Sequence, residues 1–459
     1  MQKIFDEVNS LDKRCIDKFD LTEDILMENA ASAMLQHIDT FCTTQEKILI
    51  VCGAGNNGAD GIALARMLHK KYKVSLFIPF GTVSQMGEIQ LQRAKNLNVK
   101  IISKIQKADV IVDCLFGSGL NRDLDEPTIK LIRQMNKQKA YKIACDIPSG
   151  INFLGQITTK AFYAHVTLTM GALKRPLFTD NAKEFTGEIV VANLGIQREL
   201  YEKKSTCFLL ESTDLKLPLR DTKIANKGTY GHLSVILGEK TGAGLLCADA
   251  GFAFGSGLIT VVSKETKKLP NYIMQNTSLP ENTTALCIGM GLGKKYDENV
   301  LQNSLPKVID ADLFYDMRIV DLLQQKKIVL TPHPKEFCSL LKITKIADIS
   351  IEILQNNRFK FVALFCEKYP KVVLLLKGTN VLIAQNKKTY VNSLGTAVLS
   401  KGGSGDVLCG LIGSLLAQGN SALEAAINAS LAHTIAAANY SQNNYSMTPE
   451  DLVQEIKKL

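Results

Sequence analysis

Short apolar segments alternate with helical patterns through the first half of the chain. Segments 47–52, 73–78, 109–113, 141–145 and 165–169 are strand candidates, and apolar residues at helical spacing separate them at about 59–71, 85–97 and 126–139. This alternation is typical of a parallel α/β sheet. Two helical segments, 3–19 and about 22–38, come before the first predicted strand.

The pattern breaks at about 200–226, where the sequence is polar, contains proline and has no period. In a chain of 459 residues this break predicts a domain boundary, with one domain at 1–210 and another at 222–459. Further strands are predicted at 231–238, 257–263, 284–288, 306–309, 327–330 and 371–376. A glycine-rich loop at 402–405 leads into a very apolar helix at 406–417, which we expect to be buried on most sides, and another helix at 421–439.

Composition and charge argue against several classes of protein. The chain is 46% hydrophobic and 22% charged, as in ordinary globular proteins, and no apolar run approaches the ~18 residues of a membrane span. The first residues lack the basic region and apolar core of a secretory signal. The net charge of +9 is dispersed, which argues against nucleic-acid binding. Eleven cysteines without C-x-x-C spacing favour reduced thiols in a cytoplasmic protein over disulfides or a zinc site.

The segment Gly53-Ala-Gly-Asn-Asn-Gly-Ala-Asp-Gly61 follows one predicted strand and leads into a predicted helix. Glycines let the backbone approach a phosphate closely, and a helix N-terminus favours anions. The segment also fits the G-x-G-x-x-G pattern of dinucleotide-binding enzymes. Those enzymes carry an acidic residue after the second strand to hold the ribose hydroxyls. Here that strand ends in Ile78-Pro-Phe80 without a carboxylate, so a dehydrogenase is disfavoured.

Polar residues mark the ends of the other predicted strands. Asp113 ends the strand at 109–113, and Asp146 and Ser149 follow the strand at 141–145. Because ligand sites in open α/β sheets form outside the carboxyl ends of the strands, we expect these residues to converge with Asn57 and Asp60. Their oxygens suit a hard cation, and a carboxylate can act as acid or base. A lone aspartate in such a place is more often a turn former or helix cap, but three such strand ends favour a site.

These motifs resemble the NAD(P)H-hydrate epimerase (YjeF N-terminal) family. The resemblance is carried by Met27-Glu-Asn-Ala30, the 53–61 segment, Asp113-Cys-Leu-Phe-Gly-Ser-Gly119 and Asp146-Ile-Pro-Ser-Gly150. It implies a Rossmann-like three-layer sandwich that binds the hydrated nicotinamide cofactor with a potassium ion. The implied K⁺ ligands are Asn57, Asp113 and Ser149, and Asp113 is also a candidate catalytic residue. The implied substrate contacts are Asn56, Asn57, Gly58, Ala59, Asp60, Gly117, Ser118, Gly119, Leu120, Asn121, Arg122, Asp123 and Asp146; Ala59 stands where the family usually has glycine.

In the second half, Gly402-Gly-Ser-Gly-Asp406 leads into the predicted buried helix. Successive N–H groups at such a helix start can hold a transferring phosphoryl group, and Asp406 can accept a proton from an attacking hydroxyl. Lys377 follows the strand at 371–376, where it can bind nucleotide phosphates, and prolines on both sides of His333 fix its backbone. The sequence contains no Walker motif, which excludes a P-loop enzyme.

These segments resemble the ADP/ATP-dependent NAD(P)H-hydrate dehydratase domain of the ribokinase-like α/β superfamily. Supporting motifs are Lys227-Gly-Thr-Tyr-Gly-His232, Gly242-Ala-Gly244, Gly289-Met-Gly-Leu-Gly293, Thr331-Pro-His-Pro334, Lys377-Gly378 and Gly402-Gly-Ser-Gly-Asp406. The resemblance implies Asp406 as catalytic base and Mg²⁺ with ADP as cofactor. The implied hydrate contacts are Ala243, Gly291, Leu292, His333 and Asp406. The implied nucleotide contacts are Lys377, Gly378, Thr379, Asn380, Val381, Gly402, Gly403, Ser404 and Gly405.

Both halves point to one damaged metabolite, so the sequence predicts a bifunctional repair enzyme. One domain would interconvert the R and S hydrates of NADH and NADPH (NADHX and NADPHX), and the other would dehydrate the S form with ADP or ATP. We expect a cytoplasmic homo-oligomer with small-molecule substrates and without nucleic-acid or membrane partners. Two alternatives stay open: a ribokinase-like vitamin or sugar kinase with an accessory domain, and an N-terminal domain that only binds.

Overall fold

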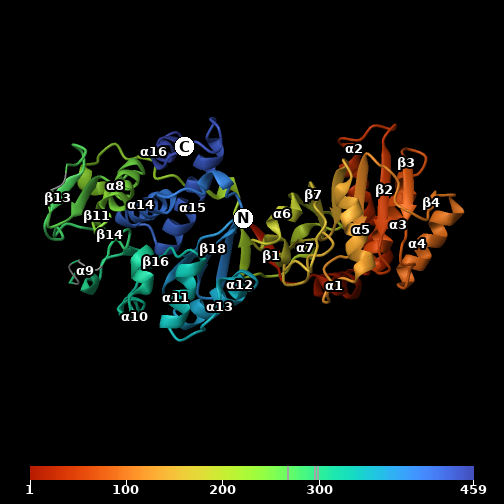
Figure 1. Ribbon diagram of the computed structural model, residues 1–459, viewed down its shortest axis with the longest axis horizontal. Coiled ribbons are helices and arrows are strands. Elements are labelled where there is room, and N and C mark those ends of the chain that lie inside the picture. The colour runs from red at the N-terminus through yellow and green to blue at the C-terminus, as the bar shows by residue number, and fades with distance from the viewer. Residues whose placement is uncertain (266–267, 294–295, 297–298) are drawn as a thin grey trace. The chain divides into compact units, whose positions relative to one another are not determined.

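The computed structural model describes residues 1–265, 268–293, 296 and 299–459, and the chain folds into two compact units (Figure 1). Lys3–Ser205 form the N-terminal unit. Thr206–Leu459 form the C-terminal unit together with Met1–Gln2. Each unit contains a sheet flanked by helices, which confirms the mixed α/β class.

The N-terminal unit is built on a parallel sheet with the strand order β4-β3-β2-β5-β6-β7-β9. Its strands are β2 (Lys47–Cys52), β3 (Lys73–Phe77), β4 (Ile101–Ile102), β5 (Val110–Cys114), β6 (Tyr141–Cys145), β7 (Val166–Met170) and β9 (Glu188–Ala192). The chain runs outward from β2 to β4 and then crosses back to β5 on the other side of β2. The strand order therefore reverses between β2 and β5, which is where ligand crevices form in such sheets.

Helices cover both faces of this sheet. The helices of the unit are α1 (Asn9–Phe19), α2 (Glu23–Asp39), α3 (Asn56–Leu68), α4 (Gln85–Asn96), α5 (Glu126–Lys137), α6 (Lys183–Thr186) and α7 (Arg198–Tyr201). Met34 of α2 and Ile62 of α3 join a buried cluster with Ile50 of β2, whereas Ile132 of α5 packs with Val51 on the opposite face. Because neighbouring strand residues point to opposite faces, the sheet feeds two cores and the unit has the three layers predicted.

The start of the chain differs from the helix predicted at 3–19. A short strand, β1 (Gln2–Phe5), comes first and pairs in parallel with β8 (Leu173–Lys174), and α1 begins only at Asn9. Ile4 is buried on this strand, and its spacing from Val8 and Leu11 of the following segment imitates a helical stripe. The predicted helix is therefore wrong over its first residues, which belong to a strand that its distant partner stabilises.

The C-terminal unit has a longer sheet with the order β13-β12-β11-β14-β15-β16-β17-β18-β19-β10. Its strands are β10 (Cys207–Leu209), β11 (His232–Ile236), β12 (Leu258–Val262), β13 (Met274–Asn276), β14 (Ala285–Ile288), β15 (Lys307–Ile309), β16 (Ile328–Leu330), β17 (Val373–Leu376), β18 (Val381–Gln385) and β19 (Lys388–Asn392). The pairs from β13 to β17 are parallel, and β17, β18 and β19 are antiparallel. The sequence had not predicted β10, β13, β18 or β19, which are short or follow polar turns.

The helices of this unit are α8 (Thr241–Ala253), α9 (Asn299–Gln302), α10 (Ile319–Leu322), α11 (Pro334–Ile343), α12 (Ile351–Gln355), α13 (Arg358–Lys368), α14 (Ser404–Ala417), α15 (Ala422–Asn439) and α16 (Pro449–Ile456). Of these, α8, α15 and α16 pack against α14, the apolar helix expected to be buried. Nearly every residue of α14 is buried, which confirms the prediction. Gly410 of α14 lies so near α8 that a Cβ there would come within 2.2 Å of the Cys247 carbonyl oxygen. In the part of the chain that the structure describes, no helix is long and apolar enough to cross a membrane.

Candidate active sites

A cavity of about 580 Å³ lies at the carboxyl ends of β2, β5 and β6, at the reversal point of the N-terminal sheet. Of the predicted substrate contacts it brings together Asn56, Asn57, Asp60, Gly117, Ser118, Gly119, Leu120, Asn121, Arg122 and Asp146. Asp123 lies beside it on the same loop and does not line it. A Cβ at Gly117 would lie 2.9 Å from Asp146 Oδ2 and 3.2 Å from Asn57 Oδ1, so both side chains face this glycine. Asn57, Asp60 and Asp146, three of the residues expected to converge, therefore border one cavity, whereas Asp113 and Ser149 do not line it.

The glycine-rich segment is mostly the first turns of α3 rather than a loop. Gly58 is needed because a Cβ there would come within 1.9 Å of the Gly53 carbonyl oxygen. Ala59 is buried, does not line the cavity and packs with Met27 and Met86. The methyl group that departs from the family pattern thus fills a small apolar cluster, and Gly58 and Ala59 can meet a ligand only through their backbone.

Asp113 and Ser149 form a buried pair beneath the cavity. Ser149 Oγ donates to Asp113 Oδ1 at 2.7 Å, and the Ser149 N–H donates to Oδ2 at 2.8 Å. The N–H of Leu115 also donates to Oδ1, at 3.2 Å. Burial raises the pKa of Asp113 to about 6, and these hydrogen bonds oppose the rise.

The predicted potassium ligands fit a hard monovalent cation in their chemistry. Asp113 is fully buried, and among the described residues no lysine or arginine forms an ion pair with it. The side-chain nitrogen of Asn57 is buried and has no hydrogen-bond partner in the described part of the chain, and rotating the amide would present its oxygen in that place. A buried carboxylate without a counter-ion and an unsatisfied amide are what an absent oxygen-bound cation would leave behind.

Among the residues that the structure describes, three carboxyl groups border the cavity, and sequence reasoning missed one of them. Asp12 of α1 lines the wall and accepts a hydrogen bond from Tyr201 at 2.7 Å. Burial raises the pKa of Asp12, and burial with the neighbouring charges of Asp146 and Asp12 raises the pKa of Asp60 well above its usual value. Asp146 instead has a cationic partner, since Lys174 Nζ lies 2.6 Å from its Oδ1. Asp12 and Lys174 lie far from the motifs in sequence, so no local spacing marked them.

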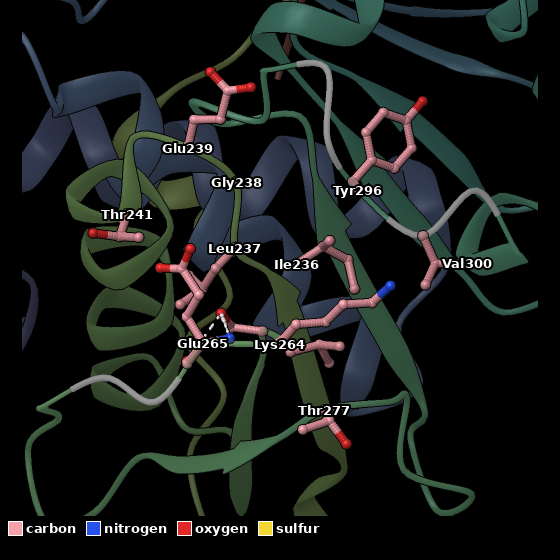
Figure 2. A pocket seen from close by; sticks show the side chains of 12 residues that line it. Ile236, Leu237, Gly238, Glu239, Thr241, Lys264, Glu265, Thr277, Tyr296 and Val300 are labelled. Carbon is pink, nitrogen blue, oxygen red and sulfur yellow. Dashed lines mark hydrogen bonds between the residues drawn. The ribbon is translucent and has the colours of Figure 1, made fainter.

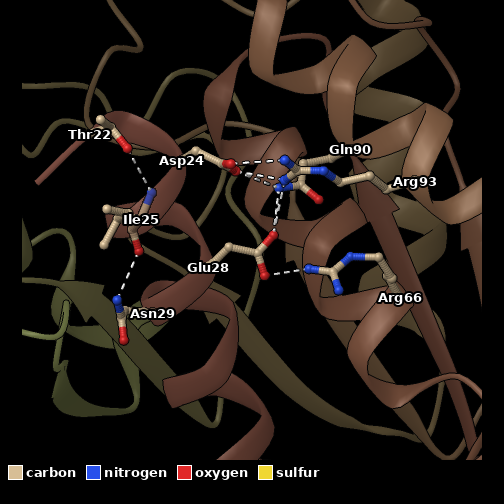
Figure 3. Close-up of polar contacts among 8 residues, drawn as sticks. All are labelled: Thr22, Asp24, Ile25, Glu28, Asn29, Arg66, Gln90 and Arg93. Atoms are coloured by element: carbon tan, nitrogen blue, oxygen red, sulfur yellow. Dashed lines mark hydrogen bonds and ion pairs between the residues drawn. The ribbon is translucent and has the colours of Figure 1, made fainter.

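A polar network fixes the helices beside the cavity (Figure 3). Glu28 of α2 pairs with Arg66 of α3 and Arg93 of α4, and Arg93 also makes two contacts with Asp24 at 2.6 and 2.8 Å. One turn earlier on α2, Glu23 accepts a hydrogen bond from the Asn56 side chain at 2.5 Å. The network therefore holds the beginning of α2 where Glu23 can orient Asn56 at the edge of the cavity.

The C-terminal unit has a cavity of about 470 Å³ between the end of β17 and the start of α14. It is lined by the predicted nucleotide contacts Lys377, Gly378, Thr379, Val381, Ser404 and Gly405, whereas Asn380, Gly402 and Gly403 lie outside it. Arg358, which the sequence analysis missed, is buried and donates to the carbonyl oxygens of Leu376, Lys377 and Asn380 at 2.9–3.2 Å. This arginine fixes the turn that carries Lys377.

Ionisable groups cluster around Lys377. Lys377 lines the cavity, whereas Asp310, Glu336 and the predicted hydrate contacts His333 and Asp406 do not. Lys377 Nζ lies 2.9 Å from Asp310 Oδ1 and 3.9 Å from Glu336 Oε2, and Glu336 also contacts His333 at 3.2 Å. Burial raises the pKa of Glu336 to about 7 despite Lys377. Burial also raises the pKa of Asp406 to about 6, helped by the charge of Asp310 and opposed by Lys377. Asp310 follows β15 as the other strand-end aspartates do, but sequence reasoning had not singled it out.

Another cavity of about 400 Å³ lies in this unit (Figure 2), and none of the remaining predicted hydrate contacts, Ala243, Gly291 and Leu292, lines it. Gly238, Glu239 and Thr241 line it at the carboxyl end of β11 and the start of α8. Gly291 adopts a positive φ of 55° and accepts a hydrogen bond from the Lys240 N–H at 2.9 Å. Ala243 follows on α8, and the Leu292 side chain is buried, so Leu292 can offer a ligand only its backbone.

Comparisons with known proteins match both units. A family described as YjeF-related protein N-terminus matches residues 23–176, and a family described as NAD(P)H-hydrate dehydratase matches residues 233–458. The bifunctional NAD(P)H-hydrate repair enzyme Nnr of Helicobacter pylori is 43% identical over 100% of both chains. The enzyme of the same name from Coxiella burnetii is 33% identical over 91% of this chain and 90% of its own. A crystal structure of the ADP/ATP-dependent NAD(P)H-hydrate dehydratase from Bacillus subtilis with ATP and Mg²⁺ covers 53% of this chain and 92% of its own, with 23% identity and a TM-score of 0.43.

Proposed function

Because this chain belongs to the family of bifunctional NAD(P)H-hydrate repair enzymes, we propose that it repairs hydrated NADH and NADPH in two steps. The N-terminal unit interconverts the R and S hydrates. The C-terminal unit dehydrates the S form at the expense of ADP and releases NAD(P)H, AMP and phosphate.

The observation that carries this proposal is that, in both units, residues of the sequence motifs line a cavity. Residues of three separate N-terminal motifs border one cavity, and those after β17 and at the start of α14 border another. A vitamin or sugar kinase with an accessory domain would not require the first of these. That alternative is not favoured, since relatives of full length carry both halves.

Epimerisation at C6 of the hydrate requires a proton for the departing hydroxyl and a base for the returning water. Asp60 and Asp146 border the same cavity in opposite electrostatic surroundings, the first among carboxylates and the second beside a lysine. Such a difference separates an acid from a base in many active sites. Asn57, Asp113 and Ser149 would hold the potassium ion, which would supply positive charge to this site.

In the C-terminal unit the reaction begins with phosphoryl transfer. The C6 hydroxyl of the S hydrate attacks the terminal phosphorus of ADP, AMP departs, and Asp406 accepts the hydroxyl proton. Phosphate then leaves C6 with the electrons of that C–O bond, and loss of a proton from C5 restores the ring double bond. Lys377 and the start of α14 face the phosphates, and Mg²⁺ bound with the nucleotide would neutralise their charge.

The test is recovery of NADH absorbance from mixed NADH hydrates with ADP or ATP. We expect complete recovery for the wild type, and recovery of only the S fraction for Asp113→Ala. A failure to recover NADH with either nucleotide would contradict the proposal. The comparison of ADP with ATP, and of NADHX with NADPHX, settles substrate preference in the same assay. The homo-oligomeric state and the cytoplasmic location stay predictions.

A further inference from the structure

Lys174 carries a buried ammonium group directly behind the N-terminal cavity. The residue is 1% exposed, and Nζ lies 2.6 Å from Asp146 Oδ1. Nζ also donates to Thr169 Oγ1 at 3.0 Å and to the Met170 carbonyl oxygen at 2.8 Å. An ammonium group has three donors, and a buried charge is tolerated only when it is paired and hydrogen-bonded. Both conditions are met here, and the pairing depends on Asp146.

The two oxygens of Asp146 have different surroundings. Oδ1 receives Lys174 and the Met170 N–H at 3.2 Å. Oδ2 receives the Ser118 N–H at 3.0 Å and lies beside Gly117, on the loop that borders the cavity. The carboxylate is therefore held from behind by the lysine, while its other oxygen lies on the side of the cavity.

Asp146 also has an unusual backbone. Its φ is +70°, in the left-handed region that residues other than glycine rarely adopt, and its N–H donates to the Leu168 carbonyl oxygen at 2.7 Å. A conformation of this kind is strained for a residue with a side chain and persists only where surrounding contacts impose it. The ion pair with Lys174 is one of those contacts.

The position of Lys174 is set independently of the cavity. Lys174 lies on β8, which pairs in parallel with β1 through Phe5, and the adjacent Arg175 forms an ion pair with Asp6 at 2.9 Å. The start of the chain thus anchors the backbone that carries the lysine. Lys174 does not itself line the cavity.

We propose that Lys174 is a positioning residue for the epimerase reaction. It neutralises Asp146 and fixes that carboxylate against the 117–118 loop, so that Oδ2 meets the hydrated nicotinamide in one orientation. The inference rests on the proposed epimerase function, in which Asp146 contacts the substrate.

The experiment compares Lys174→Met, Asp146→Asn, the double variant and Lys142→Met in the full chain. Lys142 is a matched control, since it is also buried in this unit but donates to the carbonyl oxygens of Gln138 and Ala140. Conversion of purified R hydrate to S hydrate without nucleotide gives kcat and KM by chromatography. ADP-dependent dehydration of the S hydrate by the same preparations reports an intact C-terminal unit.

We expect Lys174→Met to lower kcat for epimerisation by about 10- to 100-fold, the range for partners that orient a functional side chain, with KM much less affected. In the Asp146→Asn background the same change should lower kcat no further, because the lysine acts through Asp146. The double variant should recover the urea midpoint lost in Lys174→Met, since it leaves no unpaired buried charge, but not the activity.

Three results would overturn the inference: wild-type kcat in Lys174→Met, activity that returns together with stability in the double variant, or equal losses of both activities. Lys142→Met should keep wild-type kcat, and a comparable loss there would also count against the inference. A wild-type protein that does not exchange the epimers would instead refute the proposed function.

Discussion

Replacing Asp406 with asparagine should separate the activity of the C-terminal unit from its stability. Burial raises the pKa of Asp406 in the folded protein from 3.8 to about 6. The carboxyl group therefore stabilises the fold while it is protonated, a contribution that is complete below about pH 4 and is lost as the pH rises through 6. This rise in the pKa corresponds to about 3 kcal/mol at neutral pH.

Asparagine resembles the protonated acid and does not titrate, so Asp406→Asn should be more stable than the wild type above pH 6. The gain of up to about 3 kcal/mol corresponds to roughly 5–10 °C in the unfolding temperature of a unit of this size. Below pH 4 the two proteins should unfold at the same temperature. The same variant should lose dehydration by 10²- to 10⁴-fold, because it cannot accept the hydroxyl proton, and it should keep wild-type epimerisation.

The assay is thermal unfolding at pH 8 and pH 4 without nucleotide, with NADH recovery measured on the same samples. Asp321→Asn is the control, since that carboxylate is exposed on α10 and should alter neither quantity. Equal unfolding temperatures of variant and wild type at pH 8 would refute the electrostatic reasoning. Dehydration at the wild-type rate would refute the assignment of Asp406 as base.

Two other substitutions and one ion exchange test further parts of the structure. Gly58→Ala should lower the unfolding free energy of the N-terminal unit by more than ~2 kcal/mol, because the new methyl group meets the Gly53 carbonyl, whereas Gly55→Ala has open space and should be close to neutral in urea titrations. Arg358→Met should raise KM for ADP at least tenfold in dehydration assays and spare epimerisation, because three carbonyl groups of the nucleotide-binding turn lose their donor. Replacing K⁺ with Li⁺ should slow epimerisation but not the dehydration of purified S hydrate, which does not need the epimerase. Equal effects on both reactions would mean that the ion does not act at the N-terminal site.

The sequence predicts the alternating strands and helices of this structure well, but it predicts contacts between residues distant in sequence poorly. The strands β2, β3, β5, β6 and β7 and the burial of α14 follow from local apolar patterns, whereas the two-residue strand β4 was not predicted. Asn57, Asp113 and Asp146 follow from the rule that sites form at strand ends. Lys174 and Asp12 could not be found in this way. Their roles depend on partners far along the chain, which no periodicity records.

Two positions depart from expectation for reasons of packing: the strand β1 lies where a helix was predicted, and Ala59 stands where the family usually has glycine. The strand β1 carries apolar residues at helical spacing because the helix after it buries the same side, and only the pairing with β8 distinguishes the two. Ala59, by contrast, is explained by packing against Met27. The Met27-Glu-Asn-Ala30 motif therefore has a structural reason in this chain as well as a family resemblance.

The parallel pair of β1 and β8 also sets an order of events during synthesis. The first strand leaves the ribosome long before Leu173 and Lys174, the residues with which it pairs. At ~5–20 residues per second, it stays without its partner for on the order of 10–30 s. Asp146 emerges before its counter-ion as well. The N-terminal cavity, whose wall includes residues from the beginning of the chain, is thus among the last parts of its unit to be completed.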